Sequence, residues 1–221
     1  MTAKVFHAHL WGKREQKYAT LEEEDVSSIK WTEVEPESPF YLFIPQDKGA
    51  WKEYQQGWSL PDIFPVNVLG FQTHRDHFAV AFTRDEMEAR VADMRNPGLT
   101  NAELRAKYNL KDNRDWKLAE ARKLARKTSD SDVIRDCLYR PFDARPCYFS
   151  YEAMDYPRRE LMDHIASDRN LSMIVGRQGQ AVEDPVWALL SCSDSPHDAN
   201  IYRRGGGQAF LLYVYPTDNE A

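Results

Sequence analysis

The stretch FAVAFTRDEMEARVADMRNPGLTNAELRAKY, residues 78–108, decides the fold class of this chain. It begins with a short apolar run, 78–82, which predicts a buried strand. Thr83 and Thr100 are each followed three residues later by Glu, a capping-box pattern that predicts two helix starts. The Pro-Gly pair at 97–98 separates these helices. A strand joined directly to capped helices predicts a mixed α and β fold.

A third helix is expected from Asp112 or Asn113 to about Lys127, so that 83–128 forms one helical segment. Its predicted apolar side is Leu118, Ala121 and either Leu124 or Ala125, and its other side is basic. Phosphate contact is one role for the basic side; a solvated outer face is the alternative. The basic residues of this segment are Lys117, Arg122, Lys123, Arg126 and Lys127.

Strand-like runs flank the helical segment on both sides. FYLFI at 40–44, between two prolines, predicts a buried strand, and 5–10 predicts a short one. On the other side, a turn at 140–143 separates two strands. The turn has the sequence Arg-Pro-Phe-Asp, and its apolar pair is expected to be buried. A helix is expected from Pro157. The later strands are expected at 133–139, 147–151, 171–175, 186–190 and 209–215. The expected fold class is therefore α+β, with mixed twisted sheets and a mid-chain helical cluster.

The charge of the 221 residues is unevenly distributed. The formal net charge is −6, from 35 acidic and 29 basic residues, which argues against nucleic-acid binding by bulk charge alone. Residues 1–100 carry net −5, residues 101–134 carry net +3, and residues 135–221 carry net −4. A local basic island between acidic flanks remains compatible with an anionic ligand.

The cysteine count and the apolar runs indicate the compartment. Three cysteines without a CxxC pair fit a reducing environment. No run of apolar residues reaches the length of a membrane-spanning helix, and the first residues lack the apolar core of a signal peptide. The expected location is the cytoplasm, with no membrane partner.

The common catalytic signatures are absent from the sequence. It contains no GxxxxGK phosphate loop, no GxGxxG, no HExxH and no GxSxG. His7 with His9, and His74 with His77, have no third metal ligand at a convincing spacing, so no metal site is predicted. A Cys–His nucleophile stays open, since such pairs meet only in space.

Five blocks of sequence, in order, resemble a known family. GFQTHRDHFAV (70–80) resembles a G-[IF]-x-T-x-R-D-x-F-x-V block, and YRPFDARPCYF (139–149) resembles a Y-R-P-F-D-x-R block. PRRELMDHI (157–165), LSMIVGRQ (171–178) and QAFLLYVYP (208–216) follow at the matching spacing. HLWGKREQKYATL (9–21) resembles the junction after a methyltransferase domain. Together they resemble the C-terminal target recognition region of type ISP and type IIG-like restriction–modification enzymes.

The resemblance implies a specificity domain associated with a DNA adenine methyltransferase. It assigns residues 1–45 to a junction with a missing methyltransferase domain and 46–221 to a target recognition domain. The chain lacks the FxGxG cofactor loop and the NPPY-type motif of such enzymes, so it is expected to be non-catalytic and to bind no cofactor itself. S-adenosylmethionine, ATP and Mg are expected only for the missing parts. The implied partners are double-stranded DNA and a methyltransferase domain or subunit.

Polar residues beside the predicted strands are the candidates for DNA contact, since arginine, glutamine, asparagine and serine read base edges and hold phosphates. Structural bracing is the alternative for each, above all where Arg and Asp are neighbours. The candidates are Thr73, His74, Arg75, Arg145, Arg158, Arg159, Arg177, Gln178, Gln180, Ser193, Asp194, His197, Asn200, Tyr202, Arg203 and Arg204.

Two other classes of function compete with DNA recognition. A protein-interaction or scaffold module that docks onto a methyltransferase subunit would explain the acidic balance and the aromatic N-terminal region. A nuclease would need an ordered set of metal ligands, which the sequence does not display.

Overall fold

A computed structural model describes residues 3–38, 40–127, 133–166, 170–177, 189–202 and 206–216. The chain divides by its internal contacts into two units, Met1–Ser59 and Leu60–Ala221. The division falls after residue 59, whereas the sequence placed a boundary after residue 45.

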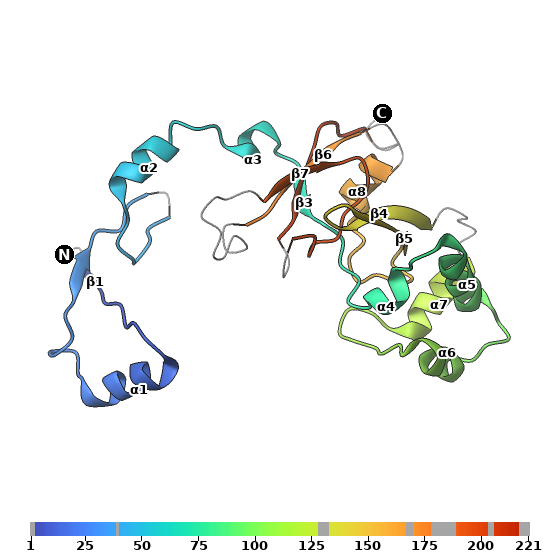
Figure 1. The fold of residues 1–221 in the computed structure, drawn as a ribbon, viewed down its shortest axis with the longest axis horizontal. Coiled ribbons are helices and arrows are strands. Elements are labelled where there is room, and N and C mark those ends of the chain that lie inside the picture. The colour runs from blue at the N-terminus through green and yellow to red at the C-terminus, as the bar shows by residue number, and fades with distance from the viewer. Residues whose placement is uncertain are drawn as a thin grey trace. The chain divides into compact units, whose positions relative to one another are not determined.

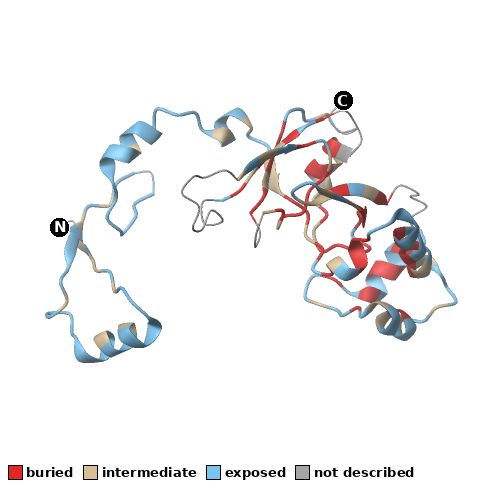
Figure 2. Ribbon diagram, viewed as in Figure 1, coloured by how far each residue is buried: buried red, intermediate tan, exposed pale blue. Residues whose placement is uncertain are grey.

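The first unit carries little regular structure (Figure 1). Strands β1 (Val5–His7) and β2 (Thr32–Val34) pair antiparallel, and the helices are α1 (Arg14–Glu23) and α2 (Lys48–Tyr54). Figure 2 shows this unit as exposed or half-buried along its described length. The prediction of a buried strand at 40–44 is wrong, because Phe40, Leu42 and Ile44 are exposed and belong to no strand.

The second unit contains a four-stranded antiparallel sheet in the order β3-β8-β6-β7. Its strands are β3 (Asn67–Leu69), β6 (Ser172–Val175), β7 (Leu190–Ser193) and β8 (Gln208–Leu211). The expectations at 171–175 and 209–215 are confirmed, with a shorter final strand. The expected strand at 186–190 falls largely outside the described residues. Helix α3 (Leu60–Ile63) precedes the sheet, and α8 (Arg159–Ala166) lies between β5 and β6 in the sequence.

A separate hairpin joins β4 (Ile134–Arg140) to β5 (Asp143–Tyr148). Arg140 pairs with Asp143, so only two residues form the turn. The turn was predicted correctly in position but wrongly as buried, because Phe142 is fully exposed. Cys137 and Cys147 are buried within the hairpin, and hydrophobic burial of this face anchors it to the core.

Three helices form the cluster expected from the sequence. Helices α5 (Arg84–Arg95), α6 (Asn101–Tyr108) and α7 (Leu118–Lys127) follow one another. Thr83 Oγ1 accepts from the Glu86 amide, and Thr100 with Glu103 forms a complete capping box. Both predicted helix starts are therefore confirmed. Met87, Met94 and Leu104 are fully buried, and each contributes roughly 1.5–3 kcal/mol by burial.

Helix α7 begins later than predicted, because a side chain holds the preceding turn. Asn113 Oδ1 accepts from the amides of Asp115 at 2.9 Å and Trp116 at 2.7 Å, an Asx-type turn that competes with helix. Asp112 Oδ1 accepts from the Leu118 amide at 3.0 Å and so marks the helix start. The turn directs Trp116 into the core.

The run 78–82 is wrong as a strand. Helix α4 (Asp76–Ala79) takes its first half, and Val80 makes only an isolated bridge to Cys147. The guanidinium of Arg90 donates to the carbonyls of Phe78 and Val80 at 2.7 and 2.8 Å. A side chain therefore takes carbonyls that a sheet ladder would have used. Residues 78–81 are still buried, whereas Phe82 is exposed, so burial was predicted correctly for four of the five residues and backbone conformation was not.

Candidate nucleic-acid interface

Four segments that are distant in the sequence converge beside the loop 70–76. The Phe71 amide donates to His197 O at 2.9 Å, and Gln72 forms a backbone bridge with Tyr156. At Gly70 a Cβ would stand only 2.5 Å from His197 O, so only glycine permits this close approach. The segments around Tyr156 and His197 thus meet the loop 70–76 within the second unit.

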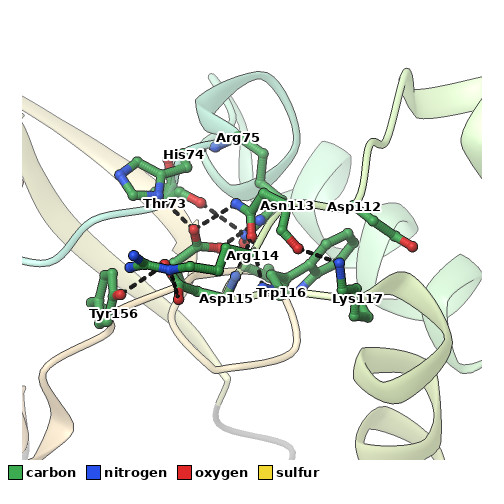
Figure 3. A network of polar contacts seen from close by, with 12 residues as sticks. Thr73, His74, Arg75, Asp112, Asn113, Arg114, Asp115, Trp116, Lys117 and Tyr156 are labelled. Atoms are coloured by element: carbon green, nitrogen blue, oxygen red, sulfur yellow. Dashed lines mark hydrogen bonds and ion pairs between the residues drawn. The ribbon is translucent and has the colours of Figure 1, made fainter.

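Arg75 lies at the centre of a buried polar network (Figure 3). Its side chain is only 4% exposed. It donates to Thr73 O at 2.8 Å, to Ala153 O at 3.0 Å and to Asp155 Oδ1 at 2.5 Å. The guanidinium also stacks on Trp116, 3.9 Å from the ring centroid. Burial lowers the pKa of Arg75 and Asp155 opposes this shift, yet arginine stays charged at neutral pH.

Asp155 is the fully buried carboxylate that gathers the donors of the network. Besides Arg75 it accepts from Asn113 Nδ2 at 2.7 Å and pairs with His74 Nδ1 at 2.5 Å. His74 itself is half-exposed at 51%. Its backbone has φ 53°, a left-handed conformation that is uncommon outside glycine and that points to a functional constraint. The network therefore holds the imidazole through Nδ1, while about half of the side chain stays accessible to solvent.

The exposed edge of the network consists of His74, Arg114, Tyr156 and Arg158. Arg114 is 86% exposed and pairs through Nε with Asp115 at 2.8 Å. Tyr156 donates to Asp115 Oδ2 at 2.9 Å, and the Arg158 guanidinium lies 5.0 Å from the Tyr156 ring centroid. Arg114 holds the pKa of Asp115 below its ordinary value, aided by Tyr156. Figure 3 shows Arg114 and Asp115 beside Tyr156.

Arg158 adds two observations that point to a ligand. Its φ is 56°, and its Nε is buried without a hydrogen bond to any described residue. A buried unsatisfied donor is unfavourable.

A second set of contacts joins this network to the β4–β5 hairpin. Asp76 accepts from Thr73 Oγ1, and Tyr139 donates to Asp76 Oδ2 at 2.6 Å. Arg145 pairs with Asp143, with Nη2 2.7 Å from Oδ2, as the structural alternative for that pair anticipated. The hairpin and the loop 70–76 therefore form one connected surface.

Several predicted contact residues are structural. Thr73, Arg75, Ser193 and His197 are buried, which favours the structural alternative for them, and their contact with DNA stays a prediction. Burial lowers the pKa of His197 to about 4, which keeps the ring neutral, and its Nε2 lies 3.2 Å from Gly207 O. Burial raises the pKa of the neighbouring Asp198 to about 6, and the Asn200 amide opposes that rise.

The remaining predicted residues of the loops stay accessible or lie outside the described ranges. Tyr202 is half-buried and donates to Ile174 O at 3.0 Å, and Arg159 pairs with Asp163 at 2.9 Å. Arg177 and Asp194 are exposed. His74, Arg145, Arg158 and Asn200 are at least partly exposed. The predictions at Gln178, Gln180, Arg203 and Arg204 lie outside the described residues.

Helix α7 offers fewer cations than its sequence suggested. Arg122 is buried and donates to Met94 O, Asn96 O and Leu99 O at 3.3, 2.6 and 2.8 Å. It therefore satisfies carbonyls at the end of α5 and in the loop after it, which favours a structural role, and its phosphate contact stays a prediction. Lys117, Lys123, Arg126 and Lys127 are exposed.

Sequence reasoning missed Asn113, Arg114, Asp155 and Tyr156. The Asn113–Trp116 turn carried a signal, because asparagine followed by polar residues favours an Asx turn over a helix. Asp155 carried none, since an aspartate in a loop does not reveal which distant cations it meets.

The described residues show neither a metal-ligand cluster nor a membrane-spanning helix. They hold no group of three or more His, Cys, Asp or Glu side chains that could bind a metal ion. Among the described helices, none has the length and apolar character needed to cross a membrane.

Comparison with known proteins identifies the sequence family and the fold. A model of the Type ISP C-terminal specificity domain matches residues 62–221. No protein with a curated description matches. A cryo-EM DrdV–DNA complex shares the fold with TM-score 0.60 and 19% identity over 97% of this chain.

Two further solved structures share the fold. A nuclease-deletion mutant of the Type ISP restriction-modification enzyme LlaGI, in complex with a DNA substrate mimic, gives TM-score 0.56 and 19% identity over 93% of this chain. The ATP-dependent Type ISP restriction-modification enzyme LlaBIII, bound to DNA, gives 0.58 and 17% over 93%. The present chain spans 23%, 21% and 14% of the three structures' chains. The mixed α and β fold predicted from the sequence is thereby confirmed.

Proposed function

The chain belongs to the Type ISP C-terminal specificity domain family, and on that premise we propose that it recognises a specific sequence in double-stranded DNA. A specificity domain serves recognition rather than catalysis. The solved structures that share its fold are bound to DNA or to a DNA substrate mimic, which supports DNA as the ligand of this chain as well.

The observation that carries the proposal is the division of the arginine network into a buried and an exposed part. Arg75 and Asp155 are buried and fix the geometry, while His74 and Arg114 are exposed and Arg158 is partly exposed, each with donor groups. Such an arrangement holds polar side chains rigidly where they meet phosphates or base edges. Arg75 and Arg114 are paired with Asp155 and Asp115, and the chain carries a net charge of −6, so the affinity of this chain alone is expected to be modest.

We assign the roles at this surface by exposure. His74, Arg114 and Arg158 contact the duplex at the network edge, and Arg177 contacts it beyond the end of β6. Lys123 and Arg126 of α7 contact phosphates. Gln178, Gln180, Arg203 and Arg204 remain proposed base contacts from the sequence alone, as do Asp194 and Asn200.

The parent enzyme is part of the same proposal. The chain would act beside an N6-adenine methyltransferase domain or subunit, in a restriction–modification enzyme whose S-adenosylmethionine, ATP and Mg are held by other parts. The exposed apolar residues of the first unit favour a docking role there. Val34, Phe40, Leu42, Ile44 and Trp51 line a groove of about 460 Å³, and burial of such a surface stabilises association.

The direct test is selection from a randomised duplex library at graded salt concentrations. The chain should enrich one sequence, with binding that weakens as salt rises. Arg177→Ala should relax the preference, whereas the Lys123→Ala/Arg126→Ala variant should weaken binding to all sequences and flatten the salt dependence. Absence of any enriched sequence, with a methyltransferase partner supplied, would refute the proposal.

A further inference from the structure

The tip of the β4–β5 hairpin carries a fully exposed aromatic side chain. The pairing of Arg140 with Asp143 leaves Pro141 and Phe142 as the turn. Phe142 is 104% exposed, so its ring contacts essentially nothing in this unit. Burial within the described chain therefore does not explain a phenylalanine at this position.

The backbone of this turn also disfavours phenylalanine. Phe142 has φ 63°, in the left-handed region that a bulky residue rarely occupies. Proline followed by a residue of positive φ is the pattern of a type II turn. The second central residue of such a turn, the place of Phe142, is usually glycine or asparagine. A residue held in such a conformation without packing of its own indicates a role outside the chain.

The stem beneath the ring is braced by stacked arginines. The Arg140 guanidinium lies 3.8 Å from the Tyr139 ring centroid, and that of Arg145 lies 4.3 Å from the Phe82 ring centroid. Asp143 accepts from Arg145 Nε at 2.9 and 3.0 Å. These contacts hold the turn in one geometry, so that the ring projects from a rigid support.

The hairpin is continuous with the proposed DNA surface. Tyr139 donates to Asp76, which also accepts from Thr73 beside His74. Arg140 lies 3.3 Å from Asp198 and 3.9 Å from Asp76, and its side chain is still partly exposed. A ring flanked by guanidinium groups has the chemistry of a wedge between bases with phosphates on either side.

We propose that Phe142 inserts as an apolar wedge into the base stack of the duplex bound by this unit. This inference rests on the proposed function. The inserted ring would unstack one base step and bend the duplex, while Arg140 would lie close to the adjacent phosphate. A protein pocket is the competing ligand for the ring, and the test separates the two.

The test compares the full chain with three variants. Phe142→Asn removes the ring and suits the left-handed backbone, Phe142→Trp keeps an aromatic ring, and Tyr151→Ala changes another exposed aromatic residue of the same unit. The probe is the duplex enriched by the unmodified chain, with 2-aminopurine at each adenine position in turn. Its fluorescence rises where the base is unstacked.

The unmodified chain and Phe142→Trp should both raise the fluorescence at one step. Phe142→Asn should abolish that rise and lower the affinity about five- to a hundredfold, the range for loss of one aromatic–base stack. Tyr151→Ala should behave as the unmodified chain. Thermal unfolding of each variant verifies that the fold is retained.

Two failures can be told apart. If the unmodified chain enriches no duplex, the proposed function fails and the wedge fails with it. If Phe142→Asn binds the enriched duplex with unchanged affinity and an unchanged rise, only the wedge is overturned. Equal loss in Phe142→Asn and Tyr151→Ala would also overturn it, because the effect would then be general to exposed aromatic residues.

Discussion

Replacement of Arg75 by methionine separates the two readings of the loop 73–76, as structural support or as DNA contact. The variant keeps an unbranched side chain that can pack on Trp116 but removes every donor. Among the described residues, the buried carboxylate of Asp155 would then keep His74 and Asn113 as its side-chain partners. Loss of one partner of a buried ion pair costs about 3–5 kcal/mol. Two backbone carbonyls, those of Thr73 and Ala153, lose a donor as well.

Urea denaturation of the full chain measures this effect. With a slope of about 2 kcal/mol per molar urea, a loss of that size lowers the midpoint by roughly 2 M. Arg114→Met is the matched control, since Arg114 belongs to the same network but is 86% exposed. An exposed pair contributes about 1 kcal/mol or less, so the control should shift the midpoint little while weakening DNA binding.

The double variant Arg75→Met/Asp155→Asn sharpens the test. Asparagine removes the uncompensated charge, so the double variant should be more stable than Arg75→Met alone. Equal midpoints for Arg75→Met and Arg114→Met would refute a structural role for Arg75. So would unchanged stability of Arg75→Met combined with a lost sequence preference.

Other perturbations give expected outcomes from single measurements. Arg122→Met should destabilise the chain by about 3 kcal/mol or more, because it leaves buried carbonyls unpaired. The control Lys123→Met, on the exposed face, should change the unfolding free energy by about 0.5 kcal/mol or less. Equal changes in the two variants would contradict the assignment of Arg122 to the end of α5. The raised pKa of Asp198, about 6 against an ordinary 3.8, means that the folded chain binds this proton more tightly. The resulting stabilisation is complete below about pH 3.8 and is lost as the pH rises through about 6. The stability of the unmodified chain relative to Asp198→Asn should therefore rise by about 1 kcal/mol from pH 7 to pH 5. A constant difference in stability across that window would refute the raised pKa of Asp198. Phe142→Asn should leave the unfolding temperature unchanged or higher, because asparagine relieves a backbone conformation that costs about 1–2 kcal/mol; a large loss of stability would show that the ring packs within the chain.

The helical cluster was predictable from local sequence. The capping threonines and the Pro-Gly pair act within a few residues of one another, and the structure places both helices as expected. Strands β4, β6 and β8 were predictable for the same reason, since alternation and turn residues are local signals, whereas β3 was not predicted.

The failures share a different cause. The runs 40–44 and 78–82 are apolar and short, and such runs do not distinguish strand from other conformations. At 78–82 the outcome was decided by Arg90, which takes the carbonyls of Phe78 and Val80. The start of α7 was decided by the Asn113 side chain. At 78–82 and at the start of α7, a specific side chain competes with backbone pairing.

The sequence by itself determined the family, the α+β class, the starts of α5 and α6 and the set of polar loops from which the candidate site is drawn. Only the tertiary structure decided which arginines of those loops support the fold and which face solvent. Arg75 and Arg122 are buried while Arg114 and Arg158 reach the surface, and no local pattern separates the two pairs. The reason is physical: the environment of a guanidinium is set by carboxylates, carbonyls and rings that arrive from segments far away along the chain. Asp155 lies 80 residues from Arg75 in the sequence and contacts it in the fold.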